Sequence, residues 1–455
     1  MTRYKRTLLK LLPVGLLILL FAFIPESDTL TRPMLTATGL LLGSLWLWLS
    51  EALPMSVSIL LMIVIAILSR LLSISEAYWR LDIGTALFVL SSSAITAAIA
   101  LSSIPQRVTR WILHLSHGRS NIFIIGFGLV VTLCSSIMSS LATCAMFAGL
   151  VNSMLGTRKS NLKRCLMIII PACAGIGGFI TPAGTPANLL LLSILESHHT
   201  PLTFAQWSMI GLPIGILTSL LFLCSILFWF RPSIDDLQQV IANRVPLSPQ
   251  RDKLTFVVIL FILTSWFISS WIPHLQLWHV SCVGMLLMLS PGIRLLKPHD
   301  LAQHINWDLV ITMGTVGILM GAISDSGLTL KFSNLLLTPF SRLSTPFLLP
   351  CLSLFICFIR TLIPTTTGVV TLLAPILINF AAFTGQEISV LLMLLGFWTA
   401  SAMLIVWTEP IYLLTWANRN YSAKDLFKAG IIPSILMSSL GVWLIRTLTI
   451  IIIAV

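Results

Sequence analysis

The chain has 455 residues, of which 57% are hydrophobic and 9% are charged, and its mean hydropathy is +0.99. A soluble globular protein of this composition would expose too much apolar surface, so we predict an all-α polytopic membrane protein. The net charge of +12 does not indicate a nucleic-acid partner, because the basic residues gather between the predicted spans, where they mark membrane topology.

Apolar segments of spanning length predict about eleven transmembrane helices. They lie near residues 8–24, 34–50, 54–72, 83–104, 166–195, 206–230, 255–273, 277–292, 308–323, 388–416 and 429–455. Two other regions, 120–156 and 345–383, place a polar tip between two apolar arms. A helical arm of about 14 residues reaches roughly 20 Å, past the bilayer midplane but short of a full crossing. We therefore predict two re-entrant helical hairpins.

The basic residues between the spans define a topology. If the N-terminus is cytoplasmic and the spans alternate, most of the 27 Lys and Arg residues fall in cytoplasmic segments, as the positive-inside rule requires. This assignment holds only if each hairpin enters and leaves on the same side of the membrane. We predict a bacterial inner (cytoplasmic) membrane protein with a cytoplasmic N-terminus and its C-terminus on the opposite side.

The tract from Gly177 to Asn188 interrupts the most apolar region of the chain with two prolines and three glycines. These residues free backbone groups that lipid cannot satisfy, and such breaks mark the substrate sites of secondary transporters. The predicted helix 388–416 has its own break, Thr408-Glu409-Pro410. A hairpin followed by a broken helix thus occurs twice. With the topology above, the hairpins open to opposite sides, which predicts two inverted repeats.

This order divides the chain into five predicted segments. They are N-terminal scaffold spans (1–82), a first inverted repeat (83–230) with hairpin 120–156 and broken helix 166–195, a cytoplasmic loop (231–254), further scaffold spans (255–307), and a second inverted repeat (308–455) with hairpin 345–383 and broken helix 388–416.

Polar groups at the two tips and the two breaks are the candidate ligands. The predicted substrate-binding residues are Ser139, Ser140, Thr143, Thr185, Pro186, Asn188, Thr365, Thr366, Thr367, Thr408 and Pro410. The predicted ion-coupling residues are Ser135, Ser139, Gly184, Thr366 and Glu409. Half-helix N-termini with adjacent hydroxyls attract anions. The alternative is that these hydroxyls only cap half-helices or satisfy exposed backbone groups.

Two charged residues lie in the second half of this predicted site. An acid in a transmembrane segment is costly, so Glu409 is a functional-site hypothesis in its own right. It is a candidate proton carrier, or else it forms a structural ion pair with Arg360. Arg360 itself either attracts an anion or, as we expect, anchors its helix at the interface by snorkelling.

The residues 179–188, with their Thr-Pro-Ala-Gly-Thr-Pro-Ala-Asn run, and Trp307-Asp308 followed by Ser326-Gly327-Leu328 are similar to motifs of the divalent anion/sodium symporter family, which includes dicarboxylate, citrate and INDY-type transporters. The resemblance covers most of the chain. It implies substrate and sodium sites at the hairpin tips, a homodimer, a scaffold and an elevator-like transport domain. The family's tip motif Ser-Asn-Thr is replaced here by Ser139-Ser140-Leu141 and Thr365-Thr366-Thr367, and its Thr-Pro-Pro-Asn by Thr408-Glu409-Pro410-Ile411.

We therefore expect a secondary active transporter for a small anion, by resemblance a di- or tricarboxylate, coupled to Na⁺, H⁺ or a counter-anion, with no other cofactor and no metal site. The alternatives are a non-transporting paralogue that acts as a sensor or partner, and an intramembrane enzyme. An enzyme is disfavoured because all eight histidines lie away from the tips. An ATP-driven pump is not indicated, because no phosphate-binding loop is present in the sequence.

Overall fold

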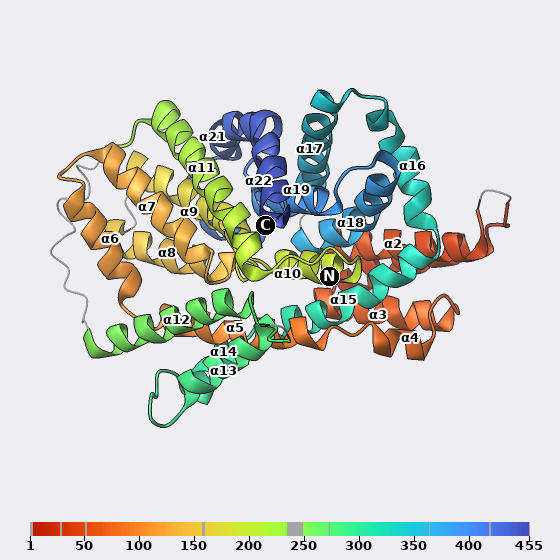
Figure 1. Cartoon of the computed structure of the whole chain (residues 1–455), viewed down its shortest axis with the longest axis horizontal. Coiled ribbons are helices and arrows are strands. Elements are labelled where there is room, and N and C mark those ends of the chain that lie inside the picture. The colour runs from red at the N-terminus through yellow and green to blue at the C-terminus, as the bar shows by residue number, and fades with distance from the viewer. Residues whose placement is uncertain are drawn as a thin grey trace.

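The computed structural model describes residues 3–27, 30–50, 52–156, 160–233, 249–272, 274–363, 365–417 and 420–454. Within these ranges the chain folds into helices and no strand (Figure 1). Most of the predicted cytoplasmic loop 231–254 lies outside the described residues. The helices of the first half are α1 (Arg3–Phe23), α2 (Arg32–Ser50), α3 (Met55–Leu68), α4 (Ile74–Trp79), α5 (Ile83–Ala100), α6 (Ile104–Leu115), α7 (Ser120–Ser135), α8 (Ser140–Leu155), α9 (Asn161–Ile180), α10 (Pro186–Ser197) and α11 (Phe204–Phe230).

The second half of the chain is also helical. Its helices are α12 (Pro249–Ser269), α13 (Leu277–Leu289), α14 (Pro298–His304), α15 (Trp307–Asp325), α16 (Leu328–Ser341), α17 (Thr345–Leu362), α18 (Thr366–Thr384), α19 (Ile388–Ala400), a 3₁₀ turn (Val406–Thr408), α20 (Pro410–Trp416), α21 (Ala423–Leu436), a π-helical turn (Met437–Gly441) and α22 (Val442–Ala454).

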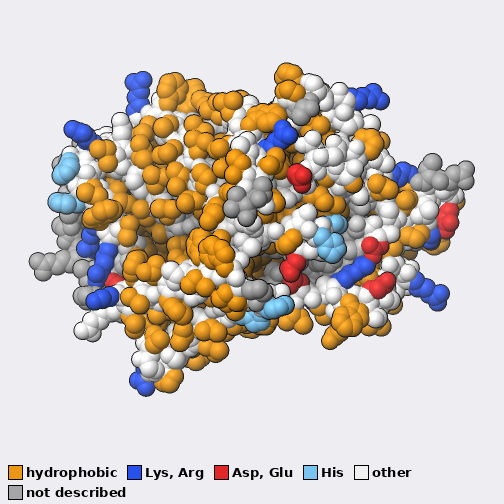
Figure 2. All heavy atoms as spheres, in the orientation of Figure 1, with side chains coloured by type: hydrophobic (Ala, Val, Ile, Leu, Met, Phe, Trp, Pro, Cys, Tyr) orange, Lys and Arg blue, Asp and Glu red, His pale blue; other side chains and the backbone are white. Residues whose placement is uncertain are grey.

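Eight of the described helices are long and apolar enough to cross a membrane. This number is below the eleven or so spans expected, since α3 and α13 have 14 and 13 residues and the predicted span 388–416 is broken into α19 and α20. A broad apolar surface covers the middle of the molecule in Figure 2, and most Lys and Arg side chains visible in this view lie toward its two ends. The predicted all-α polytopic membrane fold is confirmed.

The two predicted hairpins are helix pairs that lie toward opposite ends of the molecule (Figure 1). In the first pair, residues 136–139 join α7 to α8, and in the second, α17 ends at Leu362 and α18 begins at Thr366. The polar residues at each tip end one helix and start the next, because a hydroxyl can cap a helix whereas the apolar arms cannot. Ser139 does so for α8, where its Oγ accepts from the backbone N–H of Ala142 at 3.3 Å.

Both predicted helix breaks are present. α9 ends at Ile180 and α10 begins at Pro186, while α19 ends at Ala400 and α20 begins at Pro410. Each second half-helix therefore starts with a proline, whose missing N–H costs nothing in the first turn of a helix. The sequence breaks the two helices where proline and glycine occur, and this places four free helix ends in the interior of the protein.

Glycines on α9 let the half-helices approach closely. A Cβ atom on Gly177 would lie 2.1 Å from the carbonyl oxygen of Thr132 on α7. A Cβ atom on Gly175 would lie 2.6 Å from the carbonyl oxygen of Ala400 at the end of α19. Helix α9 is buried along most of its length. It is thus the central helix on which the first hairpin and the second broken helix both pack.

Helices α2, α3, α5, α13 and α15 form the side of the molecule that faces this centre from below in Figure 1. Two aspartates cap helix starts in this layer, and one of them, Asp308, also links α15 to α3. Asp308 on α15 accepts from the backbone N–H of Ser56 at 2.9 Å, and Asp82 accepts from the backbone N–H of Thr85 at 2.9 Å. Each carboxylate satisfies N–H groups at a helix N-terminus.

Candidate transport site

The tip of the first hairpin is hydrogen-bonded to the first helix break. The hydroxyl of Thr181 donates to the carbonyl oxygen of Ser136, and the hydroxyl of Ser135 donates to the carbonyl oxygen of Ala174 at 2.6 Å. Ser140 Oγ lies 3.2 Å from Ser135 Oγ. All of these donors are neutral hydroxyls, and they link the end of α7 to α9 and to the residue that follows α9.

Asn188 completes the first break from the second half-helix. Its side-chain amide donates to the carbonyl oxygens of Gly178 at 2.7 Å and Thr181 at 2.8 Å. The side chain is fully buried, and its Oδ1 has no hydrogen-bond partner. Because both amide protons already bond to backbone, the free atom is an acceptor. Asn188 can therefore accept from a donor or coordinate a cation, while its N–H groups hold the break closed.

The two halves of the site touch across the centre of the protein. Gly175 brings α9 against the carbonyl oxygen of Ala400 at the end of α19. The thiol of Cys144 on α8 lies 3.3 Å from the carbonyl oxygen of Ile411 on α20. Helices α8 and α9, which follow the first tip and lead into the first break, therefore both contact the helices of the second break. That the two halves build one binding site stays a prediction.

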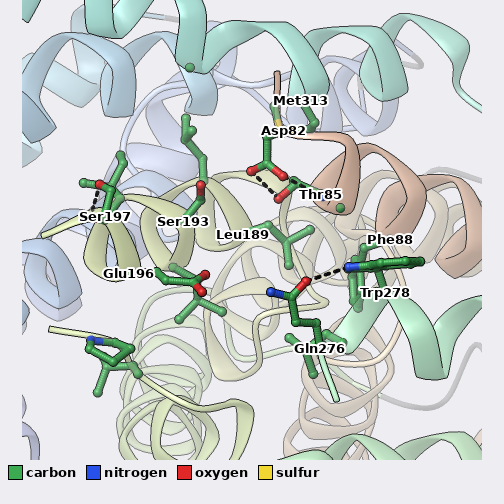
Figure 3. Close-up of a pocket in the computed structure, with 18 of the residues that line it drawn as sticks. Asp82, Thr85, Phe88, Leu189, Ser193, Glu196, Ser197, Gln276, Trp278 and Met313 are labelled. Carbon is green, nitrogen blue, oxygen red and sulfur yellow. Dashed lines mark hydrogen bonds between the residues drawn. The ribbon is translucent and has the colours of Figure 1, made fainter. Parts of the chain in front are cut away.

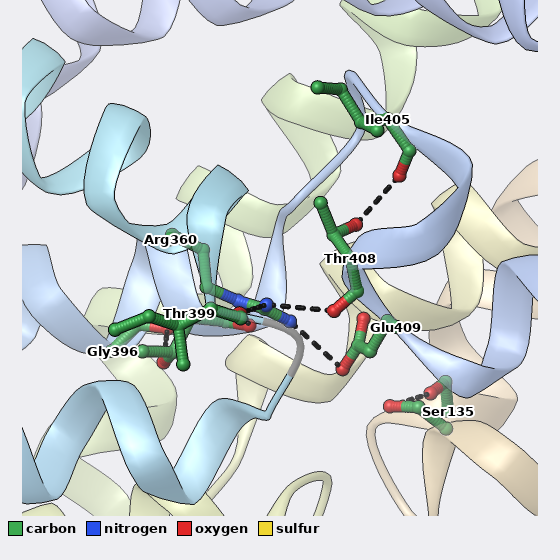
Figure 4. Close-up of polar contacts among 9 residues, drawn as sticks. Ser135, Arg360, Gly396, Thr399, Ile405, Thr408 and Glu409 are labelled. Carbon is green, nitrogen blue, oxygen red and sulfur yellow. Dashed lines mark hydrogen bonds and ion pairs between the residues drawn. The ribbon is translucent and has the colours of Figure 1, made fainter. Parts of the chain in front are cut away.

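In the second half, Arg360 takes the place that neutral donors have in the first. It belongs to the last turn of α17 and is only 1% exposed. Its guanidinium donates from Nε to the carbonyl oxygen of Thr399 at 3.0 Å, and from Nη1 to the carbonyl oxygens of Ile363 at 2.8 Å and Thr408 at 2.9 Å (Figure 4). The expectation that Arg360 snorkels to the interface is wrong, because its charge is buried among helix ends.

Glu409 faces this guanidinium from the second break. Its Oε1 lies 3.5 Å from Nη2 of Arg360, and the residue is 9% exposed. In Figure 4 the carboxyl lies between Arg360 and Ser135 at the end of α7. The structure thus shows the ion pair, which the sequence left open as an alternative to a free proton carrier. The second carboxyl oxygen, Oε2, has no hydrogen-bond partner.

Several buried polar atoms at the tips and breaks lack a protein partner. In the described part of the chain they include Thr143 Oγ1, Thr185 Oγ1, Asn188 Oδ1, Thr365 Oγ1, Ser401 Oγ and Glu409 Oε2. Buried polar atoms in native proteins are normally hydrogen-bonded, so a cluster of unpaired ones indicates a binding site. Ser401, which follows α19, was not among the residues predicted from the sequence. A polar residue directly after the end of an apolar helix is the pattern that would have identified it.

The predicted substrate residues all lie at the start of a half-helix. Ser139, Ser140 and Thr143 start α8; Thr185, Pro186 and Asn188 start α10; Thr365, Thr366 and Thr367 start α18; Thr408 and Pro410 start α20. The hydroxyl of Thr408 donates to the carbonyl oxygen of Ile405 at 2.7 Å, so it stabilises the break. Gly184 is required by packing, since its Cβ would lie 2.5 Å from the carbonyl oxygen of Gly178. The binding roles of these residues stay predictions.

A large cavity, not anticipated from the sequence, lies beside the site. It has a volume of about 1410 Å³ and runs between α5, α13 and α15 on one side and α10 and α18 on the other. Its lining includes Leu189, the residue after Asn188, and it also includes Asp82, Glu196 and Gln276 (Figure 3). The cavity therefore reaches the first turn of the half-helix that carries Asn188.

Comparison with known proteins identifies the family. A family model described as the citrate transporter matches residues 45–400. The chain belongs to the citrate transporter family. This family assignment agrees with the resemblance to anion symporters seen in the sequence motifs, and it makes the protein a transporter and not an enzyme.

Individual relatives are distant but cover most of the chain. An uncharacterized transporter of Haemophilus influenzae is 23% identical over 84% of this chain and 85% of its own length. A sodium-dependent dicarboxylate transporter of Staphylococcus aureus is 23% identical over 90% of this chain and 84% of its own. A sodium-dependent high-affinity dicarboxylate transporter of Caenorhabditis elegans is 21% identical over 75% and 70%. These similarities support a secondary transporter in the membrane.

Proposed function

We propose that this transporter moves a di- or tricarboxylate across the membrane by secondary active transport. The observation that carries the proposal is the convergence of two helix-pair tips and two helix breaks, with unpartnered hydroxyls, in a chain of the citrate transporter family. The dicarboxylate specificity named for the relatives of Staphylococcus aureus and Caenorhabditis elegans supports the substrate class.

Three helix N-termini supply the electrostatic attraction for a carboxylate. α8, α10 and α18 begin at the two tips and the first break, and each brings free backbone N–H groups and a partial positive charge. Thr143 and Thr365 add hydroxyl donors without protein partners. A dicarboxylate has two anionic ends, which suits donors from both halves of the chain. By the resemblance, the asparagines that the family carries at its tips are replaced here by Ser140 and Thr366, so hydroxyls and backbone N–H groups bind the anion.

The arrangement of the halves supports alternating access. The two helix pairs lie toward opposite ends of the molecule (Figure 1), as inverted repeats require. The cavity beside Leu189 opens one approach to the site. We propose that the two hairpins and broken helices move as an elevator-like transport domain past the scaffold helices, within a homodimer in a bacterial inner membrane. The N-terminus is cytoplasmic and the C-terminus lies on the opposite side.

Uptake by the purified protein in liposomes tests this proposal. Labelled succinate, citrate, phosphate and sulfate would be offered with an imposed Na⁺ gradient, an imposed H⁺ gradient, or internal unlabelled anion. We expect saturable uptake of a di- or tricarboxylate that one of these three driving forces accelerates. Uptake of an inorganic anion alone would contradict the substrate class. No uptake or exchange of any anion would contradict transport and favour the paralogue that acts as a sensor.

A further inference from the structure

The guanidinium of Arg360 is held in a cage of oxygen atoms. Three are the carbonyl oxygens of Ile363, Thr399 and Thr408, at 2.8 to 3.0 Å, and the fourth is Glu409 Oε1 at 3.5 Å. An all-oxygen set of carbonyls and a carboxylate is the ligand type that hard metal cations select in proteins. The cage thus has the chemistry of an alkali cation site, and an arginine fills it.

The position of the cage in the fold strengthens this comparison. α17 ends at Leu362 and α19 ends at Ala400, so the carbonyls of Ile363 and Thr399 belong to two helix C-termini. Helix C-termini carry a partial negative charge, and in secondary transporters unwound carbonyls and half-helix C-terminal ends coordinate the coupling cation. Arg360 therefore lies where the partial negative charge of two helix C-termini favours a small cation.

In the first half of the chain, neutral side chains hold the carbonyl groups at the helix break. There the carbonyls of Gly178 and Thr181 are held by the amide of Asn188, and the carbonyl of Ala174 by the hydroxyl of Ser135. Ile411 stands three residues after Thr408, as Asn188 stands three after Thr185, and it has no donor. The amide missing from the second break is thus replaced by the guanidinium that reaches it from α17.

We propose that Arg360 is a tethered cation that permanently occupies the cation site of the second half. This inference rests on the proposed transport function and deepens it, because it assigns the coupling chemistry of the same site. The second half then binds no mobile Na⁺. Any coupling ion enters through the first half, where Asn188 Oδ1 is a free oxygen ligand. Glu409 neutralises the charge of Arg360. The pair therefore adds no net charge to the transport domain, whether or not substrate is bound.

Removal of the tether should create a site for a free cation. In Arg360→Ala the three carbonyls and the Glu409 carboxylate remain, but the guanidinium does not. The purified full-length variant would be unfolded thermally in NaCl and in choline chloride of equal ionic strength. We expect Na⁺ to raise the Tm of Arg360→Ala by roughly 2 °C more than that of the wild type, as linkage to a newly bound ion requires. Millimolar guanidinium should stabilise the variant in the same way.

The control is Arg342→Ala, which removes an exposed arginine at the end of α16. It should respond to Na⁺ as the wild type does. An equal Na⁺ response in Arg360→Ala and the wild type would overturn the proposal. If Arg360→Ala cannot be purified, Arg360→Lys replaces it: the ammonium keeps the site filled, so an added Na⁺ response in this variant would also overturn the proposal. These readouts stand even if the wild type transports no carboxylate.

Discussion

The two halves of the site have the same architecture but differ in how they satisfy their free helix ends. In the first half, neutral side chains, led by Asn188, hold the carbonyl groups of the break. In the second half, Arg360 holds them and Glu409 balances its charge. The same backbone arrangement thus accepts either an amide or a guanidinium. The comparison teaches that a neutral amide and a buried cation can each hold the carbonyl groups at a helix break.

The largest effect is expected from breaking the ion pair of the second half. Glu409→Gln leaves the fully buried guanidinium without a counter-charge, so the free energy of unfolding should fall by about 4 kcal/mol, and uptake should be lost. Thermal unfolding of the purified protein and liposome uptake measure both. Glu387→Gln, at the exposed start of α19, should change stability by less than about 0.5 kcal/mol. Equal stability of the two variants would show that Arg360 needs no partner.

A smaller loss of stability is expected when the amide that holds the first break is removed. Asn188→Ala removes a donor from two buried carbonyls, and the free energy of unfolding should fall by about 2 kcal/mol, because each unpaired carbonyl keeps its desolvation penalty. Denaturant or thermal unfolding measures this loss. Asn152→Ala, on the half-buried face of α8, serves as the control and should be nearly neutral. A loss for Asn188→Ala as large as that for Glu409→Gln would contradict the distinction between the neutral and the charged half.

Exchanging the donors between halves sharpens the comparison further. Ile411 Cδ1 and the carbonyl oxygen of Ala400 both lie near Gly175, so an amide at position 411 can reach the end of α19. Adding Ile411→Asn to Arg360→Ala should raise the free energy of unfolding by about 1 kcal/mol relative to Arg360→Ala alone. In the wild-type background the same change should not stabilise, because Arg360 already holds the carbonyl oxygens of Thr399, beside Ala400, and Thr408. A double variant no more stable than Arg360→Ala would contradict this equivalence.

The smallest effect on stability, with a specific effect on binding, is expected at the first tip. Thr143 Oγ1 is buried and has no protein partner, so Thr143→Val should leave the fold intact while the KM for the carboxylate rises about tenfold through one lost hydrogen bond. Concentration-dependent uptake measures this change. In the control Thr371→Val, the lost hydroxyl bonds only to the carbonyl of Thr367 in its own helix. An unchanged KM for Thr143→Val would remove this residue from the site.

Most of the fold followed from the sequence because long apolar segments and Pro/Gly breaks act locally. The breaks at Thr181 to Thr185 and before Pro410 were predicted from residues that cannot continue a helix in lipid. The selected hydroxyls were found by the same reasoning, since they stand at helix starts. Local patterns therefore predicted the helical architecture and the positions of the tips and breaks.

The contacts of Arg360 could not be predicted in the same way. Its partners Thr399 and Thr408 are 39 and 48 residues away, and they are backbone carbonyls, which no side-chain pattern reveals. The sequence showed only that a charged residue lies in an apolar helix. Such a residue either snorkels to the interface or is buried, and the local sequence is the same in both cases. The cavity beside Leu189 was missed for a related reason, because it forms between helices from both halves.

The number of sodium ions coupled to each substrate tests the central claim most directly. Reversal potentials of substrate-driven currents would be measured in liposomes with imposed Na⁺ gradients, for the wild type and for Arg360→Ala. If Arg360 fills the cation site of the second half, the variant couples one more Na⁺ per substrate than the wild type. The same number of coupled Na⁺ ions in both proteins would contradict the account.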